Sequence, residues 1–424
     1  MRIMHVADLH LDTPFVGMGK DFQAIQSRLL ESAYIAFERC INVAINRKVD
    51  LMLIVGDVYD AQKQTVKAQY FFHQQLERLS QADIPVVFCH GNHDYMTASV
   101  EGRRYPEGIH VFRDNKLSYI DLDLSNGESV RVYGFSYKNQ WIADRMIDQF
   151  PTNPYQTIYT IGMIHGELAS KDASQAHYAP FTLEDLLDKH YDYWALGHIH
   201  QANVLHQTPL IQYPGTIQGR HRNETGPKGA YIIELNQGQA TGNEFIELSP
   251  IIWQKVELNC QWHLQAADLL KQIQHIIANY QSEAQGHDQS YILDIELNHA
   301  ERLDDDLQTQ ISQGQLLEAI QDELDEDHFV VVAKISLNRS LMVSAFEYDR
   351  NLNQSFEEAY TALNDDKEYQ SMMAPLENHP TIQTYLKGLI MEEELRNEIS
   401  KGARDLVVQS LGFDQEGEAT KDED

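Results

Sequence analysis

Side chains that commonly bind metal ions follow five short apolar segments in the first half of this 424-residue chain. These polar segments are, in order, Asp8-Leu9-His10, Gly56-Asp57-Val58-Tyr59-Asp60, Gly91-Asn92-His93-Asp94, His165-Gly166 and Gly197-His198-Ile199-His200. Imidazole, carboxylate and amide ligands without cysteine suit Mn²⁺, Fe²⁺ or Zn²⁺. The set is larger than one ion can use, and two ions that share a carboxylate would account for the surplus. Such a pair, about 3.5–4 Å apart, activates water and neutralises a phosphoryl group in transfer.

Each segment taken alone has an ordinary structural explanation. Asp57 could cap a helix, the GNHD segment could form a turn, and a single histidine such as His165 or His198 is more often a hydrogen-bonded core residue. Five such segments at strand ends of one α/β unit favour a shared site instead. Alternation places Asp8 and His10 on one side of the chain if the backbone stays extended, and the same holds for His198 and His200.

These segments lie in a region where apolar strands alternate with amphipathic helices. The predicted strands are 2–7, 51–55, 84–89, 131–135, 158–164, 193–197, 210–213 and 229–235. Apolar residues at three- and four-residue steps predict helices near 22–48 and 64–80. Near-continuous apolar strands between such helices indicate a sheet covered on both faces. In these folds the chemistry gathers at the carboxyl ends of the strands.

The rest of the chain predicts a smaller α/β unit followed by charged helices. Residues 253–337 read as three strands separated by helices at 263–279 and about 314–324, and apolar residues recur at helical spacing over 382–411. The acidic last dozen residues are typical of a disordered tail. The predicted domains are therefore 1–250, 251–340, 341–412 and 413–424.

The charge of the chain limits which partners it can bind. Its 33 basic and 64 acidic residues give a net charge of −31, with only −8 of it in residues 1–250. Strong acidity argues against a broad nucleic-acid-binding surface. The absence of an apolar run of about 18 residues predicts no membrane span, and the N-terminus has no signal-peptide pattern. Cys40, Cys89 and Cys260 lie far apart, as buried thiols in a reducing compartment would, so we expect a cytoplasmic protein.

The series D-x-H, GDxxD, GNHD, H-G and GHxH resembles the calcineurin-like metallophosphoesterase superfamily. The stretches MHVADLHLDTP, GDVYDA and LGHIH…YPGT resemble its SbcD-type DNA-repair nucleases, and GTIQGRHRNETGPKGAY resembles their YhaO-like subset. The resemblance is specific over roughly residues 1–235 and looser over 250–340. It implies an α/β fold: a metallophosphoesterase-type β-sandwich flanked by helices, with a smaller α/β capping domain and C-terminal helices.

The resemblance also implies two metal sites joined by Asp57, holding Mn²⁺ by preference, with Fe²⁺ or Zn²⁺ as alternatives. One site would be formed by Asp8, His10, Asp57 and His200, and the other by Asp57, Asn92, His165 and His198. His93 would stabilise the transition state and protonate the leaving 3′ oxygen, Asp94 would orient His93, and Asp60 would be accessory. The basic residues expected to contact substrate, unless they are ordinary surface charges, are Arg103, Arg104, Arg220, Arg222 and Lys228.

The implied activity is that of a metal-dependent DNA nuclease in DNA repair. It would act as a 3′–5′ exonuclease and single-strand endonuclease, through a hydroxide that bridges the two metals. The implied partners are DNA, a coiled-coil ATPase of the SbcC type and a second copy of the chain. The acidic C-terminal helices would bind the ATPase, unless they form only a packed subdomain.

Two other functions stay open. A phosphoesterase acting on a small molecule or a phosphoprotein would use the same seven ligands, and the acidity of the chain favours it. A non-catalytic scaffolding role is disfavoured, because all seven ligands and His93 are present.

Overall fold

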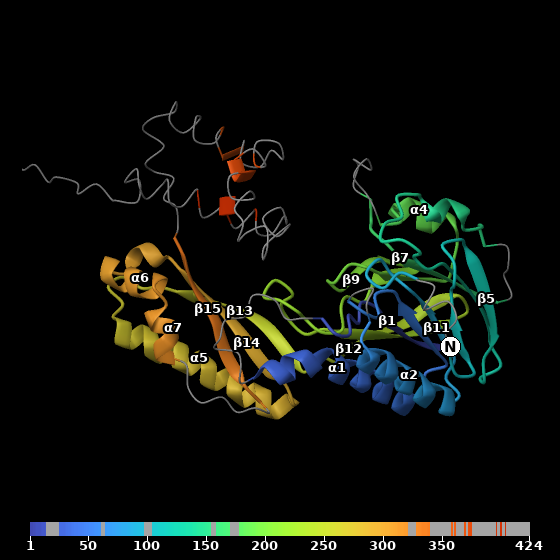
Figure 1. Cartoon of the computed structure of the whole chain (residues 1–424), viewed down its shortest axis with the longest axis horizontal. Helices are drawn as coiled ribbons and strands as arrows, with labels where there is room; N and C mark the ends of the chain where they lie inside the picture. Colours follow the sequence, from blue (N-terminus) through green and yellow to red (C-terminus); the bar gives the residue numbers. More distant parts are fainter. Residues whose placement is uncertain are drawn as a thin grey trace, which may run out of the picture. The chain divides into compact units, whose positions relative to one another are not determined.

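The computed structural model describes seven long stretches of the chain (Figure 1). They are residues 1–13, 25–60, 64–96, 104–153, 158–169, 178–320 and 328–339, with isolated positions between 358 and 403. The contacts divide the chain into two units. The first comprises Met1–Leu258, Gln265–Glu296 and Gln310–Ser336, and the second comprises Asn259–Leu264, Leu297–Thr309 and Leu337–Asp424. Except for isolated positions, the predicted helical segment 382–411 and the predicted acidic tail lie outside the described residues.

Two six-stranded sheets form the main part of the first unit. The first sheet has the order β12-β11-β1-β2-β3-β4, in which β1 to β4 run parallel and β11 is antiparallel to both of its neighbours. Its strands are β1 (Arg2–Val6), β2 (Leu51–Val55), β3 (Val86–Cys89), β4 (Ile109–Val111), β11 (Gly229–Asn236) and β12 (Gln239–Glu247).

The second sheet has the order β5-β6-β7-β8-β10-β9. Its four central strands run parallel, and the strand at each edge is antiparallel to its neighbour. Its strands are β5 (Ser118–Asp123), β6 (Ser129–Gly134), β7 (Tyr159–His165), β8 (Tyr193–Gly197), β9 (Asn203–Gln207) and β10 (Leu210–Tyr213).

The two sheets pack face to face through alternate residues of their central strands. Leu53 and Val87 of the first sheet belong to the same buried cluster as Val132 and Met163 of the second. The opposite face of the first sheet packs against the helices α1 (Gln26–Arg47) and α2 (Val66–Gln81), as Figure 1 shows. The central strands are thus buried on both faces, which explains their continuous apolar sequence.

Local sequence signals set the limits of these helices. Phe37, Cys40, Ile41 and Ala44 of α1 are completely buried and recur at three- and four-residue steps. The helix ends at Lys48, which adopts a left-handed conformation (φ 50°). The side chain of Thr65 caps α2 by accepting a hydrogen bond from the Ala68 amide.

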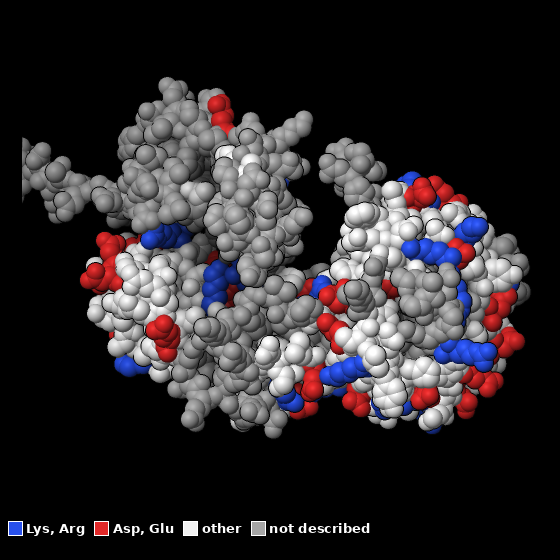
Figure 2. All heavy atoms as spheres, viewed as in Figure 1, with Lys and Arg blue, Asp and Glu red and all other residues white. Residues whose placement is uncertain are grey.

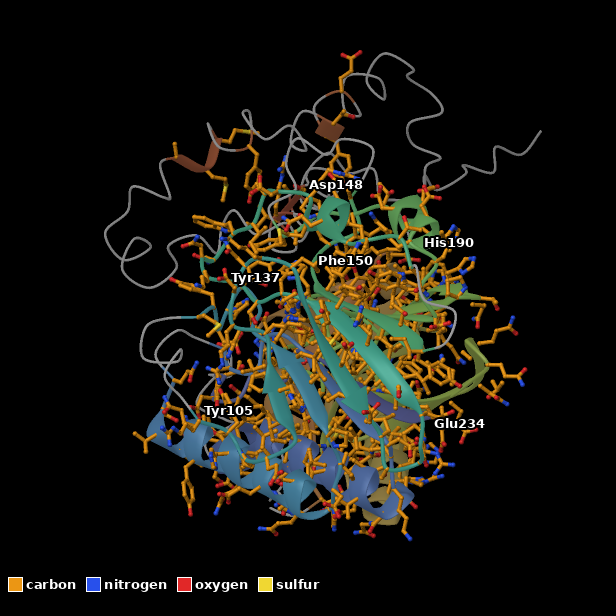
Figure 3. The ribbon with its side chains drawn as sticks, turned by 90° about the vertical axis from the view of Figure 1, so that its right-hand side faces the viewer. Tyr105, Tyr137, Asp148, Phe150, His190 and Glu234 are labelled. Atoms are coloured by element: carbon orange, nitrogen blue, oxygen red, sulfur yellow. The ribbon has the colours of Figure 1, made fainter. Side chains whose placement is uncertain are left out.

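The outer face of the second sheet is covered by loops and by two short helices, η2 (Met146–Gln149) and α4 (Leu183–Asp188). Figure 3 shows Phe150, which directly follows η2, between that helix and the strands. The ring of Phe150 contacts that of Trp194 on β8, with 5.3 Å between the centroids. The result is a β-sandwich with helices outside the first sheet and a mixed layer outside the second, which confirms the predicted fold class.

A separate three-stranded sheet has the order β13-β14-β15. Its strands are β13 (Ile251–Asn259), β14 (Ser290–Asn298) and β15 (Val330–Asn338), and the helix α5 (Ala266–His287) connects the first two. Trp253, Ile292 and Val331 of this sheet form one cluster with Ile25 and Leu29 at the start of α1. The shorter helices in this part are η4 (Ala300–Arg302), α6 (Asp305–Ser312) and α7 (Gln315–Ile320).

The predicted strands of the sandwich correspond to its eight inner strands within one to three residues at each end. The four unpredicted strands, β4, β5, β9 and β12, are the edges of the two sheets. None of them contains a buried residue, so they lack the apolar run by which a strand is recognised. α6 was also unpredicted, and α7 lies within the helix expected at about 314–324.

Two further predictions concern membranes and cysteines. No helix among the described residues combines the length and apolar character that a membrane crossing needs. All three cysteines are free and buried, as expected.

The packing between the sheets leads to a test of stability. Leu53→Ala removes a completely buried side chain from this interior, and we expect it to lower the free energy of unfolding by about 2–5 kcal/mol. Leu30→Ala is the matched control because Leu30, on α1, is 45% exposed, and its cost should stay near 0.5 kcal/mol. Urea unfolding followed by intrinsic fluorescence measures both, and equal losses in the two variants would contradict the proposed packing.

Candidate dinuclear metal centre

Five strand ends bring the predicted ligands together. Asp8, Asp57 and Asn92 follow β1, β2 and β3, which are neighbouring parallel strands of the first sheet. His165 ends β7 and His198 follows β8, its parallel neighbour in the second sheet. Parallel strands place their carboxyl ends at one edge, and the two sheets face each other, so all five segments meet at one end of the sandwich.

The backbone turns sharply where it presents these ligands. Asp8, His10, Asp57 and His198 all have positive φ angles, of 53°, 44°, 47° and 102°. The expectation of an extended chain at Asp8–His10 and at His198–His200 is therefore wrong. The His10 amide donates to the Asp57 carbonyl oxygen at 3.0 Å, and this bond fixes one ligand loop against the other. A left-handed backbone costs a non-glycine residue on the order of 1–3 kcal/mol, and such strain concentrates at functional sites.

Asp57 lies between two groups of donor atoms. On one side, His165 Nε2 is 3.3 Å from Asp57 Oδ2 and 2.9 Å from Asn92 Oδ1, which is 3.1 Å from His198 Nδ1. On the other side, His10 Nε2 is 3.8 Å from Asp57 Oδ2 and 3.1 Å from His200 Nε2. Ligand atoms that share one ion at about 2.0–2.2 Å lie roughly 3–3.5 Å apart. The spacing in both groups is suitable for metal binding.

Asp8 links the two groups. Its carboxylate has donor atoms within 4.8 Å of those of His10 and His200, and likewise of those of Asp57 and His165. It also accepts the backbone amide of His198 at 3.1 Å. Asp8 and Asp57 are both buried. Two buried carboxylates this close to one another are unfavourable unless cationic groups neutralise them.

The histidine rings are oriented with one nitrogen held and the other facing the centre. Nδ1 lies 3.1 Å from Asp60 Oδ1 in His10, 2.7 Å from Glu224 Oε1 in His200, and 3.0 Å from the Val55 carbonyl oxygen in His165. A proton on each Nδ1 leaves the lone pair of Nε2 directed inward. His10 and His200 then point two lone pairs at each other across 3.1 Å, an arrangement that a cation bound to both would stabilise.

The pKa values of the carboxylates reflect this crowding. Burial raises the pKa of Asp8 to about 6. Burial would also raise the pKa of Asp57, but the adjacent His165 reverses that effect and holds it well below the ordinary value.

The histidines divide according to their neighbours. Burial tends to lower the pKa of His165, yet Asp57 and Asp8 raise it to about 9. Burial lowers the pKa of His10 to about 4 and that of His198 to about 3. His10 and His198 are therefore neutral near pH 7, which is the state that binds a metal, whereas His165 must release its proton first.

Two glycines let the ligand loops approach this closely. A Cβ atom on Gly91 would lie 2.2 Å from Asp57 Oδ1 and 2.7 Å from His165 Nε2, inside the proposed metal site. A Cβ atom on Gly197, at the end of β8, would lie 2.0 Å from the carbonyl oxygen of Val55 at the end of β2. The two sheets thus touch backbone to backbone directly behind the metal centre.

His93 lies beside the two groups of ligands. Its ring is 5.0 Å from that of His10 between centroids, and its side chain is 42% exposed. Its Nδ1 is 3.1 Å from the Asp60 carbonyl oxygen, and its backbone amide donates to Asp57 Oδ1 at 2.9 Å. This is where a group that contacts the substrate next to the metals is expected.

The contacts of Asp94 differ from the predicted role of orienting His93. Asp94 is completely buried, accepts the amides of Gly91 and Val58, and places Oδ2 3.2 Å from Nδ1 of His90. Its carboxylate therefore holds two ligand loops in place, and the group next to His93 is Asp60. Sequence order suggested the pair because Asp94 directly follows His93, but the turn directs adjacent side chains apart.

Glu224 is a residue at this site that the sequence analysis missed. It is 7% exposed, holds Nδ1 of His200, and accepts the backbone amide of Arg220 at 2.7 Å. Carboxylates that hold a metal-binding histidine in this way raise its basicity and fix its orientation. The signal was its place in the RHRNETG stretch, 24 residues after His200, but no spacing rule connects the two.

The basic residues predicted to contact substrate have different surroundings. Arg220 donates to Asp60 Oδ1 at 2.9 Å and lies 3.6 Å from Glu224, so it braces the site. Lys228 is only 5% exposed. Arg104 is exposed and Arg222 is half-buried, whereas Arg103 lies outside the described residues. Among the described members of this set, Arg104 and Arg222 keep the accessibility that a phosphate contact needs.

Comparison with known proteins agrees with this geometry. Residues 1–202 match the model of the family described as calcineurin-like phosphoesterase, so the chain contains such a domain. Members of this class hydrolyse phosphate esters, in agreement with the enzyme class predicted from the sequence. The described Asp and His residues are placed to bind metal, as that prediction requires.

Three curated relatives show how far the similarity extends. "Uncharacterized metallophosphoesterase YhaO" of Bacillus subtilis is 33% identical over 260 residues, 61% of this chain and 63% of that protein. "DNA double-strand break repair protein Mre11" of Thermoplasma acidophilum is 25% identical over 247 residues, 56% and 62% of the two chains. The D subunit of the nuclease SbcCD from Bacillus subtilis is 24% identical over 344 residues, 72% and 80%. The chain spans less than two thirds of the length of the first two.

The position of Asp57 predicts that one substitution empties both sites. Asp57→Asn removes the charge shared by the two groups of ligands, and we expect the bound metal to fall from two equivalents to less than one. Asp188→Asn is the matched control because Asp188 is exposed at the end of α4. Metal analysis after equilibrium dialysis against Mn²⁺ gives the stoichiometry. Two equivalents retained by Asp57→Asn would rule out the bridging role.

Protonation of Asp8 and His165 predicts how metal affinity varies with pH. The pKa of about 9 means that His165 carries a proton that metal must displace at neutral pH, and Asp8 takes up a second proton as pH falls through about 6. The affinity should therefore weaken by about tenfold per pH unit between pH 8 and pH 6, and more steeply below pH 6. Mn²⁺ titrations at fixed pH values measure this slope, and a flat profile between pH 8 and pH 5.5 would contradict it.

Proposed function

We propose that the chain is a metal-dependent DNA nuclease that hydrolyses phosphodiester bonds at the centre formed around Asp57. The observation that carries the proposal is the meeting of two groups of nitrogen and oxygen donors at one shared carboxylate, with His93 beside them. The descriptions of two relatives, as a double-strand break repair protein and as part of a nuclease, support DNA as the substrate. The proposed activities are 3′–5′ exonuclease and single-strand endonuclease.

The residues of this chain would divide the chemistry among them. Asp8, His10, Asp57 and His200 would hold one divalent ion, and Asp57, Asn92, His165 and His198 the other, with Mn²⁺ as the proposed metal. Two ions in such a site supply an activated water and neutralise the charge that develops on the phosphoryl group.

His93 would act on the leaving group. The Asp60 carbonyl oxygen accepts from Nδ1 of His93, which leaves Nε2 to carry a proton to the departing 3′ oxygen. Asp60 would position both His93 and His10 from one carboxyl residue, since its Oδ1 atom is 3.1 Å from Nδ1 of His10. Arg220, bound to the same Oδ1 at 2.9 Å, keeps Asp60 ionised and in place.

The proposal extends to partners and cellular setting. We propose that the protein acts in DNA repair in the cytoplasm as a homodimer, together with a coiled-coil ATPase that binds residues 341–412. One relative is described as a single component of a nuclease with more than one kind of chain, which supports a multicomponent assembly. The proposed domains remain the nuclease domain 1–250, the capping domain 251–340, the partner-binding region and the tail 413–424.

The charge of the chain favours a second candidate, a phosphoesterase that acts on a small molecule or a phosphoprotein. The net charge is −31, and Figure 2 shows acidic side chains interspersed with the basic ones over the face it presents. A small substrate needs only the metals and His93, whereas a DNA strand must overcome this negative field.

One assay separates the two candidates and tests the role of His93. With Mn²⁺, the wild-type protein should degrade single-stranded and duplex DNA, and His93→Ala should lower kcat by roughly 10²–10⁴-fold while keeping two equivalents of metal. Asn92→Ala should lose activity together with metal. The matched control is His73→Ala on α2, whose side chain is 38% exposed, and it should leave the rate unchanged.

A chromogenic phosphodiester measured in parallel identifies the substrate class. Hydrolysis of the chromogen with no cleavage of any DNA would overturn the nuclease proposal in favour of the second candidate. A His93→Ala protein as active as His73→Ala on DNA would instead exclude His93 from the chemistry.

A further inference from the structure

The loop that follows β6 lies along the candidate metal centre. The Tyr137 amide donates to the carbonyl oxygen of His90, and the Tyr137 carbonyl oxygen accepts the amide of Met96, so this loop pairs with the segment that contains Asn92 and His93. The Tyr137 hydroxyl also donates to the carbonyl oxygen of His165 at 3.0 Å. Figure 3 shows Tyr137 at the end of the sandwich away from Glu234 on β11.

This loop exposes a tryptophan beside the site. Trp141 is 60% exposed, whereas Ile142, the next residue, is 8% exposed and fixes the loop in the protein. Ile142 forms a parallel bridge with Tyr178, and the Ala179 amide donates to its carbonyl oxygen at 2.7 Å. The Tyr178 ring in turn lies against the ring of His198, a proposed metal ligand, with 4.5 Å between centroids.

The chain geometry limits the distance between the indole and the metals. Consecutive Cα atoms are 3.80 Å apart, and paired strands lie about 4.7–4.9 Å apart. The backbone of Trp141 is therefore within roughly 10 Å of that of Tyr178, or about three stacked nucleotides at a rise of 3.4 Å per nucleotide. A DNA strand with a phosphate at the metals would bring one of its nearest bases to this position.

Electrostatics supports stacking as the way this chain would hold DNA. Phosphate contacts supply most of the affinity of ordinary DNA-binding proteins, but this chain has a net charge of −31, and two of the predicted contacts, Arg220 and Lys228, are paired or buried. Stacking of a base on an aromatic ring needs no positive charge and tolerates any sequence. An exposed tryptophan next to the site provides such a ring.

We propose that Trp141 is a stacking platform for an unpaired base close to the scissile phosphate, with Tyr178 lining the path between them. The inference rests on the proposed nuclease function and defines its substrate class more narrowly. A base inside an intact duplex has no free face to offer, so the preferred substrates are single strands, or ends whose terminal bases have separated.

The test compares two exposed tryptophans. Trp141→Ala should weaken binding of a fluorescent single-stranded oligonucleotide by about 5- to 100-fold, measured by anisotropy in a His93→Ala background so that no cleavage intervenes. Trp262→Ala is the matched control, since Trp262 is 56% exposed and belongs to the second unit, and it should bind as the parent does. Trp141→Phe should recover most of the lost affinity, and a blunt duplex should bind each variant within twofold of the parent.

The outcomes distinguish the inference from the function on which it rests. Equal losses for Trp141→Ala and Trp262→Ala, or no loss for Trp141→Ala, would overturn the platform while a nuclease activity of the wild type still stood. A wild type that binds single strands through Trp141 but cleaves no DNA would refute the proposed nuclease and leave the platform in place. A change of oligomeric state in Trp141→Ala, seen by light scattering, would assign Trp141 to a protein contact and overturn the inference. Metal content equal to that of the parent confirms that each variant is folded.

Discussion

Burial of the Asp57 carboxylate among nitrogen donors is the constraint on which the rest of this structure depends. Three loops reach it: His165 Nε2 at 3.3 Å, His10 Nε2 at 3.8 Å, and the backbone amide of His93 at 2.9 Å. An isolated buried carboxylate is strongly unfavourable, so these partners must be present together. The order of strands makes that possible, because β1, β2 and β3 are parallel neighbours and β7 and β8 face them from the other sheet. Fold and site are in this sense one solution.

The strained backbone has the same origin. Ligands that leave five strands must turn inward within two or three residues, and Asp8, His10, Asp57 and His198 do so with positive φ angles. Aspartate and histidine tolerate this region better than branched residues do. The packed sandwich behind them, with completely buried residues such as Phe37 and Trp194, supplies the stability that such strain requires.

What the sequence revealed follows from how strongly each feature depends on local pattern. Inner strands such as β2 are buried on both faces and read as apolar runs, whereas the edge strand β5 alternates exposed and half-buried residues and gave no signal. The seven proposed ligands were identifiable because their types and their place after strands can be read from the chain. The partners of the ligands could not be, since Glu224 reaches His200, and Asp94 reaches His90, through turns that no spacing encodes.

The close contact between Gly197 and the Val55 carbonyl oxygen makes the two halves of the sandwich a single mechanical piece at the metal centre. Nothing compressible separates them there, so any change in the distance between the sheets is passed directly to the spacing of the two groups of ligands. Interior residues far from the chemistry are consequently under selection for volume as well as for hydrophobicity. Divergent descendants of this protein should drift freely at their surfaces while the filling of the interior changes only by exchanges that conserve its thickness.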